Sequence, residues 1–119
     1  MEGRMSKELN AKWLELVAAG KAAWMPGMLS LPPQADRCQR DGQMMVGRLP
    51  DFSDPATLGA LLGQVRERWK DDRISLVFNV VYGTWMVLRT DDAAPDGKCL
   101  IGFGFIEAEA LLVALEVAR

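Results

Sequence analysis

One stretch of the chain, from Asp51 to Trp69, constrains the fold more than any other because it predicts an amphipathic helix with a defined start. Asp54 can accept hydrogen bonds from the free amides of the first turn, and Pro55 suits the first helical position, which needs no amide hydrogen. Apolar side chains then recur at helical spacing and form one stripe: Leu58, Leu61, Leu62, Val65 and Trp69. We expect Leu62, near the centre of this stripe, to be fully buried.

Two glycines, Gly59 and Gly63, stand four residues apart inside this predicted helix. Each costs about 1 kcal/mol relative to alanine in a helix interior, so a packing reason is expected. They lie on the flank of the apolar stripe. We therefore expect another helix to approach closely there, either the last helix of the chain or one from a symmetry mate.

Two further helices are predicted near the ends of the chain. The first extends from Ser6, a suitable N-cap, to Gly20, a suitable C-terminal stop, and carries Leu9, Trp13, Leu16 and Val17. The second extends from Ile106 to Ala118 and is apolar on two faces. One face holds Ala108, Leu111, Leu112 and Leu115, and the other holds Ala110, Val113, Ala114 and Val117.

Three strands are predicted between the last two helices. Residues 74–82, ISLVFNVVY, alternate with period two and are rich in β-branched side chains, which is typical of a strand central in its sheet. Tyr82-Gly83 forms a turn, and Thr84–Arg89 and Lys98–Phe103 form the second and third strands. The polar residues 90–97 connect these two.

The region before the Asp51–Trp69 helix is less regular. Residues 22–33, AAWMPGMLSLPP, are apolar but contain three prolines and Gly27, so they cannot form a continuous helix. This segment either covers the core of its own domain or contacts another subunit or partner, since Trp and Met are enriched at interface centres. Residues 37–48 predict a hairpin around Asp41-Gly42, a dipeptide suited to a type I′ turn.

These elements predict a single α+β domain over residues 1–119 with the order α-ββ-α-β-β-β-α. Its architecture is a two-layer sandwich, in which a three-stranded antiparallel sheet, with the additional hairpin, packs against two to three helices. Residues 1–53 contribute the first helix, the apolar segment and the hairpin, and residues 54–118 form the α-β-β-β-α core.

Composition excludes several classes of function. The formal net charge of -2 is opposite to the basic footprint that general nucleic-acid binding requires. No apolar run reaches the length of a membrane span, and the N-terminus lacks an apolar signal core, so we expect a cytoplasmic protein that does not bind membranes. The chain has no histidine, which removes the usual general-base and zinc sites, and Cys38 and Cys99 show no CxxC spacing. We therefore expect no catalytic residues, no cofactor and no metal.

Three local patterns suggest a function but are incomplete. The helix-strand-strand-strand-helix order matches the double-stranded RNA-binding domain, yet Glu107 and Glu109 stand where that domain places phosphate-binding lysines. Gly102-Phe103-Gly104 resembles the start of a dinucleotide-binding loop without its third glycine. Asp91, Asp92 and Asp96 crowd one loop, but without EF-hand spacing, so a solvated turn is expected.

Three segments of the chain resemble small uncharacterised proteins encoded by tailed bacteriophages and prophages. They are WMPGML (24–29), LPDFSDPATLGALLGQVRE (49–67) and EAEALLVALEVA (107–118), which correspond to a proline-glycine turn, a DFxDPATLG helix and an EAEALVxALE terminal helix. These proteins tend to have a small hydroxyl residue just before the last helix, where this chain has Ile106. The resemblance implies a phage or prophage origin and supplies no catalytic residues.

Three functional classes follow, in order of preference. The first is an accessory protein that acts by protein-protein interaction, as a homodimer or with a host or phage protein. Its contact residues are predicted from the apolar segment and the back of the last helix: Trp24, Met25, Met28, Leu29, Leu31, Val113 and Val117. The second is a nucleic-acid-associated module using Arg37, Arg40, Arg48 and Lys98. The third is an enzyme that uses Glu107 and Glu109 with Asp91 or Asp92.

Overall fold

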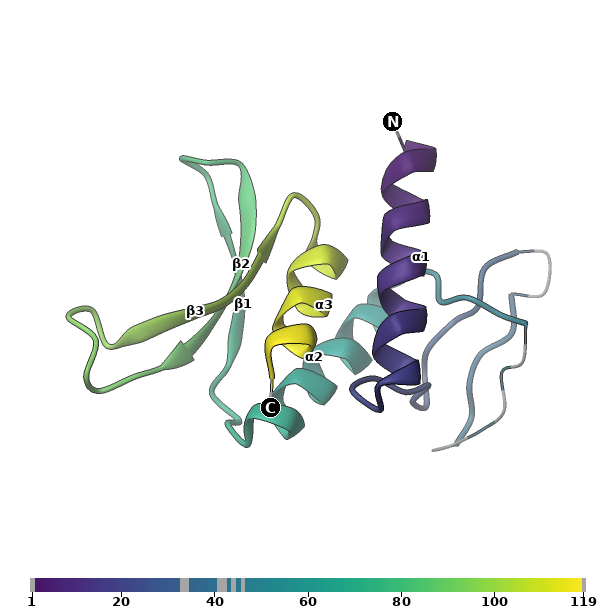
Figure 1. Ribbon diagram of the computed structural model, residues 1–119, viewed down its shortest axis with the longest axis horizontal. Coiled ribbons are helices and arrows are strands. Elements are labelled where there is room, and N and C mark those ends of the chain that lie inside the picture. Colours follow the sequence, from purple (N-terminus) through teal and green to yellow (C-terminus); the bar gives the residue numbers. More distant parts are fainter. Residues whose placement is uncertain (1, 33–34, 41–42, 44, 46, 119) are drawn as a thin grey trace. The chain divides into compact units, whose positions relative to one another are not determined.

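The computed structural model describes residues 2–32, 35–40, 43, 45 and 47–118. It contains three helices and three strands in the order α1, α2, β1, β2, β3, α3 (Figure 1). The chain divides into two compact units, Met1–Leu61 (unit 1) and Leu62–Arg119 (unit 2). The division falls within α2, Pro55–Trp69, whose bounds agree with the predicted helix. Each unit is described by itself.

Unit 1 begins with helix α1, Glu2–Ala18, which starts before the predicted N-cap. Ser6 therefore lies inside the helix, and the prediction that it caps the helix is wrong. The predicted end is confirmed, because Gly20 has a left-handed backbone with φ 72°. The Lys21 amide then donates to the Leu16 carbonyl at 2.8 Å, which closes the last turn.

The apolar segment of unit 1 lies between two other stretches of chain. On one side the segment forms two backbone hydrogen bonds with Cys38. The Gly27 amide donates to the Cys38 carbonyl, and the Cys38 amide donates to the Met28 carbonyl. On the other side the Leu31 amide donates to the Leu49 carbonyl at 2.9 Å. Because it is flanked on both sides, this segment can bury Met28 completely.

The predicted hairpin of residues 37–48 is only partly described. Its turn residues Asp41 and Gly42 lie outside the described residues, so the hairpin stays a prediction. Within the described part, Arg37 pairs with Leu29 through an antiparallel bridge. The start of the predicted hairpin therefore pairs with the apolar segment.

Helix α2 buries a face that differs slightly from the predicted one. Leu61 and Val65 are fully buried, and Thr57 and Gln64 are buried with them. Leu62 is only half-buried, so its prediction as the buried centre of the stripe is wrong. Apolar spacing alone could not identify this face, because two polar side chains belong to it.

The two glycines of α2 do not mark a close contact in this chain. Gly59 and Gly63 are exposed, and a Cβ atom added to either would meet no atom within 4 Å. The expected approach of the last helix at Gly63, which lies in the same unit as that helix, is therefore wrong. A contact with another molecule at these glycines stays untested.

Unit 2 contains an antiparallel sheet of β1 (Ser75–Asn79), β2 (Thr84–Thr90) and β3 (Lys98–Gly104), in the order β1-β2-β3. β2 is the central strand, so the prediction that the first strand is central is wrong. That strand also ends earlier than predicted, because the Asn79 side chain accepts hydrogen bonds from the Val81 and Tyr82 amides and turns the chain. A register shift next to Val87 interrupts the pairing of β2 with β3.

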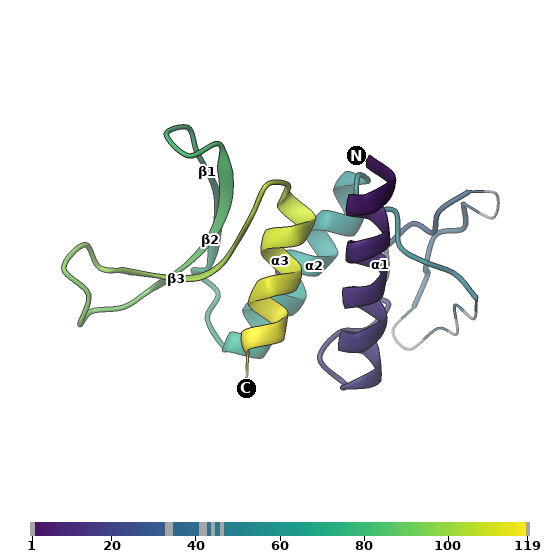
Figure 2. The same ribbon diagram turned by 45° about the horizontal axis from the view of Figure 1, so that its top comes forward.

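Helix α3, Glu107–Val117, lies along one face of this sheet, over β3 and β2 (Figures 1 and 2). The contact is close because Gly102 has no side chain: a Cβ atom there would lie 2.4 Å from the Ala110 carbonyl oxygen and 2.9 Å from the Ala114 nitrogen. Ala110 and Ala114 therefore face the sheet. They belong to the stripe that was expected to lie behind the helix, and both are fully buried.

Trp69, the last residue of α2, joins the helices and the sheet of unit 2. Its indole nitrogen donates a hydrogen bond to the Ala114 carbonyl at 3.0 Å. The guanidinium of Arg89, from β2, lies over its ring at 5.2 Å from the centroid, which is within cation-π range. The end of α2 thus contacts both α3 and strand β2.

The start of α3 is capped from within the helix. Ile106 occupies the N-cap position and makes no side-chain cap, as the sequence predicts for a residue without a polar side chain. Instead Glu109 Oε1 accepts a hydrogen bond from the Phe105 amide at 2.8 Å. A carboxylate at this end is favoured by the helix dipole.

The architecture is therefore α+β, with an antiparallel three-stranded sheet and three helices in the predicted order. The expectation of one domain stays a prediction. The contacts within the chain divide it after Leu61, whereas the sequence predicted a junction between residues 53 and 54.

The close approach at Gly102 yields a paired test of the fold. We expect Gly102→Ala to lower the free energy of unfolding by about 1–3 kcal/mol, because its methyl group would collide with the backbone of α3. Gly63→Ala, which faces open space in a helix, is expected to raise it by about 0.5–1 kcal/mol. Urea unfolding of both variants measures the difference, and equal effects would show that Gly102 is not a packing constraint.

Candidate functional site

A hydrogen-bonded junction surrounds the start of α2 in unit 1. Asp54 Oδ2 accepts hydrogen bonds from the amide and the hydroxyl of Thr57 and from Arg37 Nη1, each at 3.0 Å. Arg37 Nη1 also donates to the Gly27 carbonyl at 2.7 Å, and the Thr57 hydroxyl oxygen accepts the Leu29 amide at 2.9 Å. The junction ties the helix start to the apolar segment.

The electrostatics of Asp54 show that this junction is structural. Burial raises the pKa of Asp54, but the hydrogen bonds from Arg37 and Thr57 outweigh burial and hold the pKa below its ordinary value of 3.8. A carboxylate with a lowered pKa stays ionised near neutral pH and does not donate protons. Asp54 therefore serves as an ion-paired helix cap.

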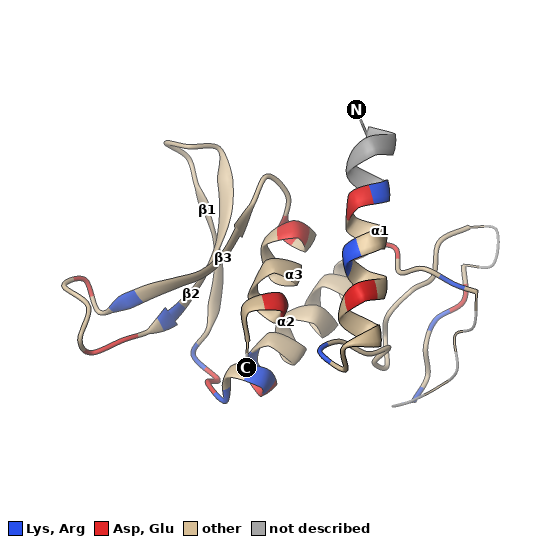
Figure 3. Ribbon diagram, viewed as in Figure 1, with Lys and Arg blue, Asp and Glu red and all other residues tan. Residues whose placement is uncertain are grey.

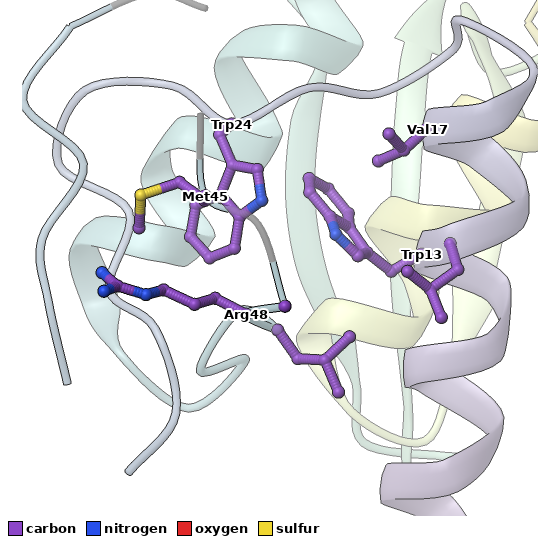
Figure 4. Close-up of a pocket in the computed structure, with 8 residues that line it drawn as sticks. Trp13, Val17, Trp24, Met45 and Arg48 are labelled. Carbon is purple, nitrogen blue, oxygen red and sulfur yellow. The ribbon is translucent and has the colours of Figure 1, made fainter. Parts of the chain in front are cut away.

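Unit 1 also contains an apolar hollow of about 480 Å³ that opens to the surface. The rings of Trp13 and Trp24 lie across from each other in it, 6.0 Å apart between centroids and nearly perpendicular (Figure 4). The guanidinium of Arg48 forms an ion pair with Asp36, so the one charged lining residue already has a partner. The hollow can hold an apolar group and has no chemistry for a reaction. Its lining consists of Trp13, Leu14, Val17, Trp24, Met45, Gly47, Arg48 and Leu49.

In unit 2 the face of the sheet opposite α3 is largely apolar and carries no helix of that unit among the described residues (Figures 1 and 2). The register places on it five apolar side chains, which we call the outer sheet face, and beside them polar side chains such as Ser75, Thr84 and Lys98. Phe103 is 59% exposed and Leu100 49% exposed, and the other three are half-buried. The set is Val77, Met86, Leu88, Leu100 and Phe103.

The turn between β1 and β2 continues this apolar surface. Val80, Val81 and Tyr82, which we call the apolar turn, are 81%, 79% and 76% exposed. Asn79 holds the turn closed, so these side chains cannot fold back onto the sheet as part of β1. Three consecutive exposed apolar residues are unfavourable in a soluble domain unless a contact uses them.

Much of the sheet carries no charged residue. Residues 74–88 and 99–106 contain no Asp, Glu, Lys or Arg. Figure 3 shows both signs of charge at the end that carries the β2–β3 loop. At the other end β3 leads into the acidic first turn of α3, with Glu107 and Glu109, while the apolar turn itself contains no charged residue.

The predicted interaction residues are distributed over both units. In unit 1 Met28 is fully buried and cannot contact a partner, and Trp24, Met25, Leu29 and Leu31 are half-buried. In unit 2 Val113 is half-buried and Val117 is 51% exposed. The sequence reasoning missed the apolar turn, because alternation alone placed Val80 and Val81 in a strand.

The basic residues of the nucleic-acid hypothesis do not gather as free cations. Arg37 pairs with Asp54 and Arg48 with Asp36, while Arg40 is exposed. Lys98 lies in unit 2, at the start of β3. Two of the three arginines are thus already neutralised by a carboxylate.

The carboxylates of the enzyme hypothesis lie at opposite ends of β3. Asp91 and Asp92 belong to the loop before this strand, and Glu107 and Glu109 follow it, so about 20 Å of extended strand separates them. Asp91 and Asp96 accept backbone hydrogen bonds from Ala93 and Lys98, as in an ordinary turn. These four carboxylates do not form one site.

Other chemistry is sparse in the part of the chain that the structure describes. It contains no group of three or more His, Cys, Asp or Glu side chains placed to hold a metal ion. Cys38 is a buried free thiol and Cys99 a half-buried one. No helix within the described ranges is long and apolar enough to cross a membrane.

Comparison of the chain with protein-family models, with curated proteins and with solved structures finds no match. The resemblance to phage and prophage proteins therefore stays an expectation from the three sequence segments.

The lowered pKa of Asp54 predicts how stability depends on pH. Asp54→Ala is expected to lower the free energy of unfolding by about 0.5–2 kcal/mol near neutral pH, because the helix start loses its cap. Since the folded pKa is below the ordinary 3.8, this stabilisation is present above that value and is lost as the pH falls through the folded pKa.

Urea unfolding of the unmodified protein and of Asp54→Ala between pH 7 and pH 3 measures how the difference in their stability depends on pH. The two stabilities should converge at the acid end. Asp54→Asn serves as the control, because it keeps an acceptor for the Thr57 amide but cannot pair ionically with Arg37. A difference between the original protein and Asp54→Ala that does not change with pH would contradict the role of the ionised carboxylate.

Proposed function

We propose that the protein is a small phage or prophage accessory protein of the cytoplasm that acts by protein-protein interaction through the apolar surface of unit 2. The observation that carries the proposal is the apolar turn, with Val80, Val81 and Tyr82 each more than three-quarters exposed. The outer sheet face next to it extends the same surface. The resemblance of the three sequence segments supports the phage or prophage origin.

Leaving this apolar surface in contact with water is unfavourable in free energy. Burial of apolar area contributes about 25 cal/mol per Å², so covering the turn and the outer sheet face supplies a driving force for association. A tyrosine beside aliphatic residues is also typical of the side chains that dominate binding energy at interfaces. The three residues of the turn are uncharged, so a partner that covers them need not desolvate an ion there.

A nucleic-acid role is not supported by any specific observation on the described residues. The outer sheet face has no basic side chain apart from Lys98 at its end, and phosphate binding requires several such contacts. An enzymatic role of the kind considered would require Asp91 or Asp92 to lie in one site with Glu107 and Glu109, and β3 separates them.

The test replaces the apolar turn with Val80→Ser, Val81→Asn and Tyr82→Ser together. Because these side chains are exposed, we expect unfolding stability to change by no more than about 0.5 kcal/mol per site. Association, with a second copy or with a protein captured from host cells and then purified for direct titration, should weaken at least about tenfold.

The matched control is Leu14→Gln, an exposed apolar residue of α1 in unit 1. It removes a similar apolar area elsewhere and should leave binding unchanged. If the turn variant binds as the original protein does, or if only the Leu14 variant loses binding, the apolar turn is not the contact surface.

A further inference from the structure

The two edges of the sheet differ in how well they are protected from pairing with another strand. The order β1-β2-β3 makes β1 and β3 the edge strands, and among the described residues neither pairs with a further strand. Natural sheets block such edges with charged residues, proline, bulges or short irregular strands, because an open edge pairs readily with a further strand.

The β3 edge carries these protections. It begins with Lys98, its pairing with β2 is irregular beside Val87, and two of its seven residues are Gly102 and Gly104. Lysine at an edge, a break in register and glycine each disfavour addition of another strand.

Within the strand itself β1 carries none of them. Its five residues, Ser75–Asn79, include no charge, proline or glycine, and they pair with β2 in unbroken register. A charged group lies just before the strand, where Arg66 Nε, from α2, donates a hydrogen bond to the Ile74 carbonyl at 3.0 Å. A strand with no charged residue of its own and with regular geometry is suited to receive a further strand.

We propose that this edge is occupied by β1 of a second copy of the chain, antiparallel and related by a two-fold axis at Val77. The result is one continuous sheet of six strands, three from each copy. The proposal rests on the proposed function and names its partner as the protein itself.

The occupant follows from the sequence of β1, which is chemically symmetric about its centre. In the antiparallel register Val77 faces Val77 of the second copy, Leu76 faces Phe78, and Ser75 faces Asn79. Apolar residues therefore meet apolar residues and polar ends meet polar ends. Cross-strand pairs of this kind stabilise a sheet, and no like charges are brought together. A two-fold contact requires this self-complementarity.

The β1 edge by itself is a small contact. A pair of five-residue strands buries less than the roughly 1,200 Å² of a stable interface, so Phe78, which is 48% exposed, and the apolar turn must also be covered. Both lie at the end of β1, next to the start of β1 in the second copy. We therefore expect a reversible dimer with a dissociation constant in the micromolar range.

The experiment places a charge on the two-fold axis. In Val77→Lys two ammonium groups face each other, and in Val77→Glu two carboxylates do. Each variant alone should raise the dissociation constant at least about a hundredfold, and an equal mixture should restore a dimer because opposite charges then meet. Sedimentation velocity of the full-length chain measures the mass, 13.2 kDa for one copy and twice that for the dimer.

Phe103→Lys is the matched control, since it charges the outer sheet face away from the β1 edge. It should leave the dimer intact. If it dissociates the dimer while the Val77 variants do not, the copies stack by their faces and edge pairing is refuted. The inference is also overturned if the unmodified protein keeps the mass of one copy, 13.2 kDa, at 100 μM. In that case the proposed function is still supported if a different protein binds the unmodified chain and fails to bind the apolar-turn variant.

Hydrogen exchange of the original protein gives a second readout that depends on no variant. Amides of Ser75–Asn79 should become more protected as the protein concentration rises, while those of β3 should not. Protection of β1 that is independent of concentration would exclude pairing of this edge between copies.

Discussion

The missing side chain at Gly102 determines how unit 2 is built. Because nothing projects from this position, the backbone of α3 can lie directly on β3, with Ala110 and Ala114 against the strand. A larger residue there would push the helix away and leave a gap under it. One face of the sheet is thereby tightly covered, and the other, with its five apolar side chains, is left without a helix of the same unit.

The organisation of unit 1 depends on an ion-paired cap instead. Asp54 accepts hydrogen bonds from Thr57, in the first turn of α2, and from Arg37. The Thr57 hydroxyl oxygen in turn accepts a hydrogen bond from the Leu29 amide. These contacts explain the string DPAT as a structural element: the carboxylate caps, the proline suits the first position, and the threonine satisfies a distant amide. The sequence segment that carries most of the resemblance to phage proteins therefore contains the residues that attach this helix to the rest of unit 1.

The two units differ in where apolar area remains uncovered. In unit 1 Trp13 and Met28 are fully buried, and the ring of Trp24 packs against that of Trp13. Unit 2 instead ends β1 with a turn that holds three apolar side chains in water, beside an uncharged strand edge. A surface of this kind is stabilised by covering it, and the proposed interaction role rests on this property.

Local structure could be predicted from the amino-acid sequence. Caps, glycine stops and the periods of 3.6 and 2 predicted α2, the three strands and α3 nearly to their ends, because these signals depend on neighbouring residues. The sequence could not determine which face of α2 is buried, since Thr57 is satisfied by Leu29 from a distant segment. Nor could it show that β1 is an edge, that Ala110 and Ala114 face the sheet, or that the free apolar surface is a turn. Those features depend on which segments meet in space, and such contacts between distant residues leave no local pattern in the sequence.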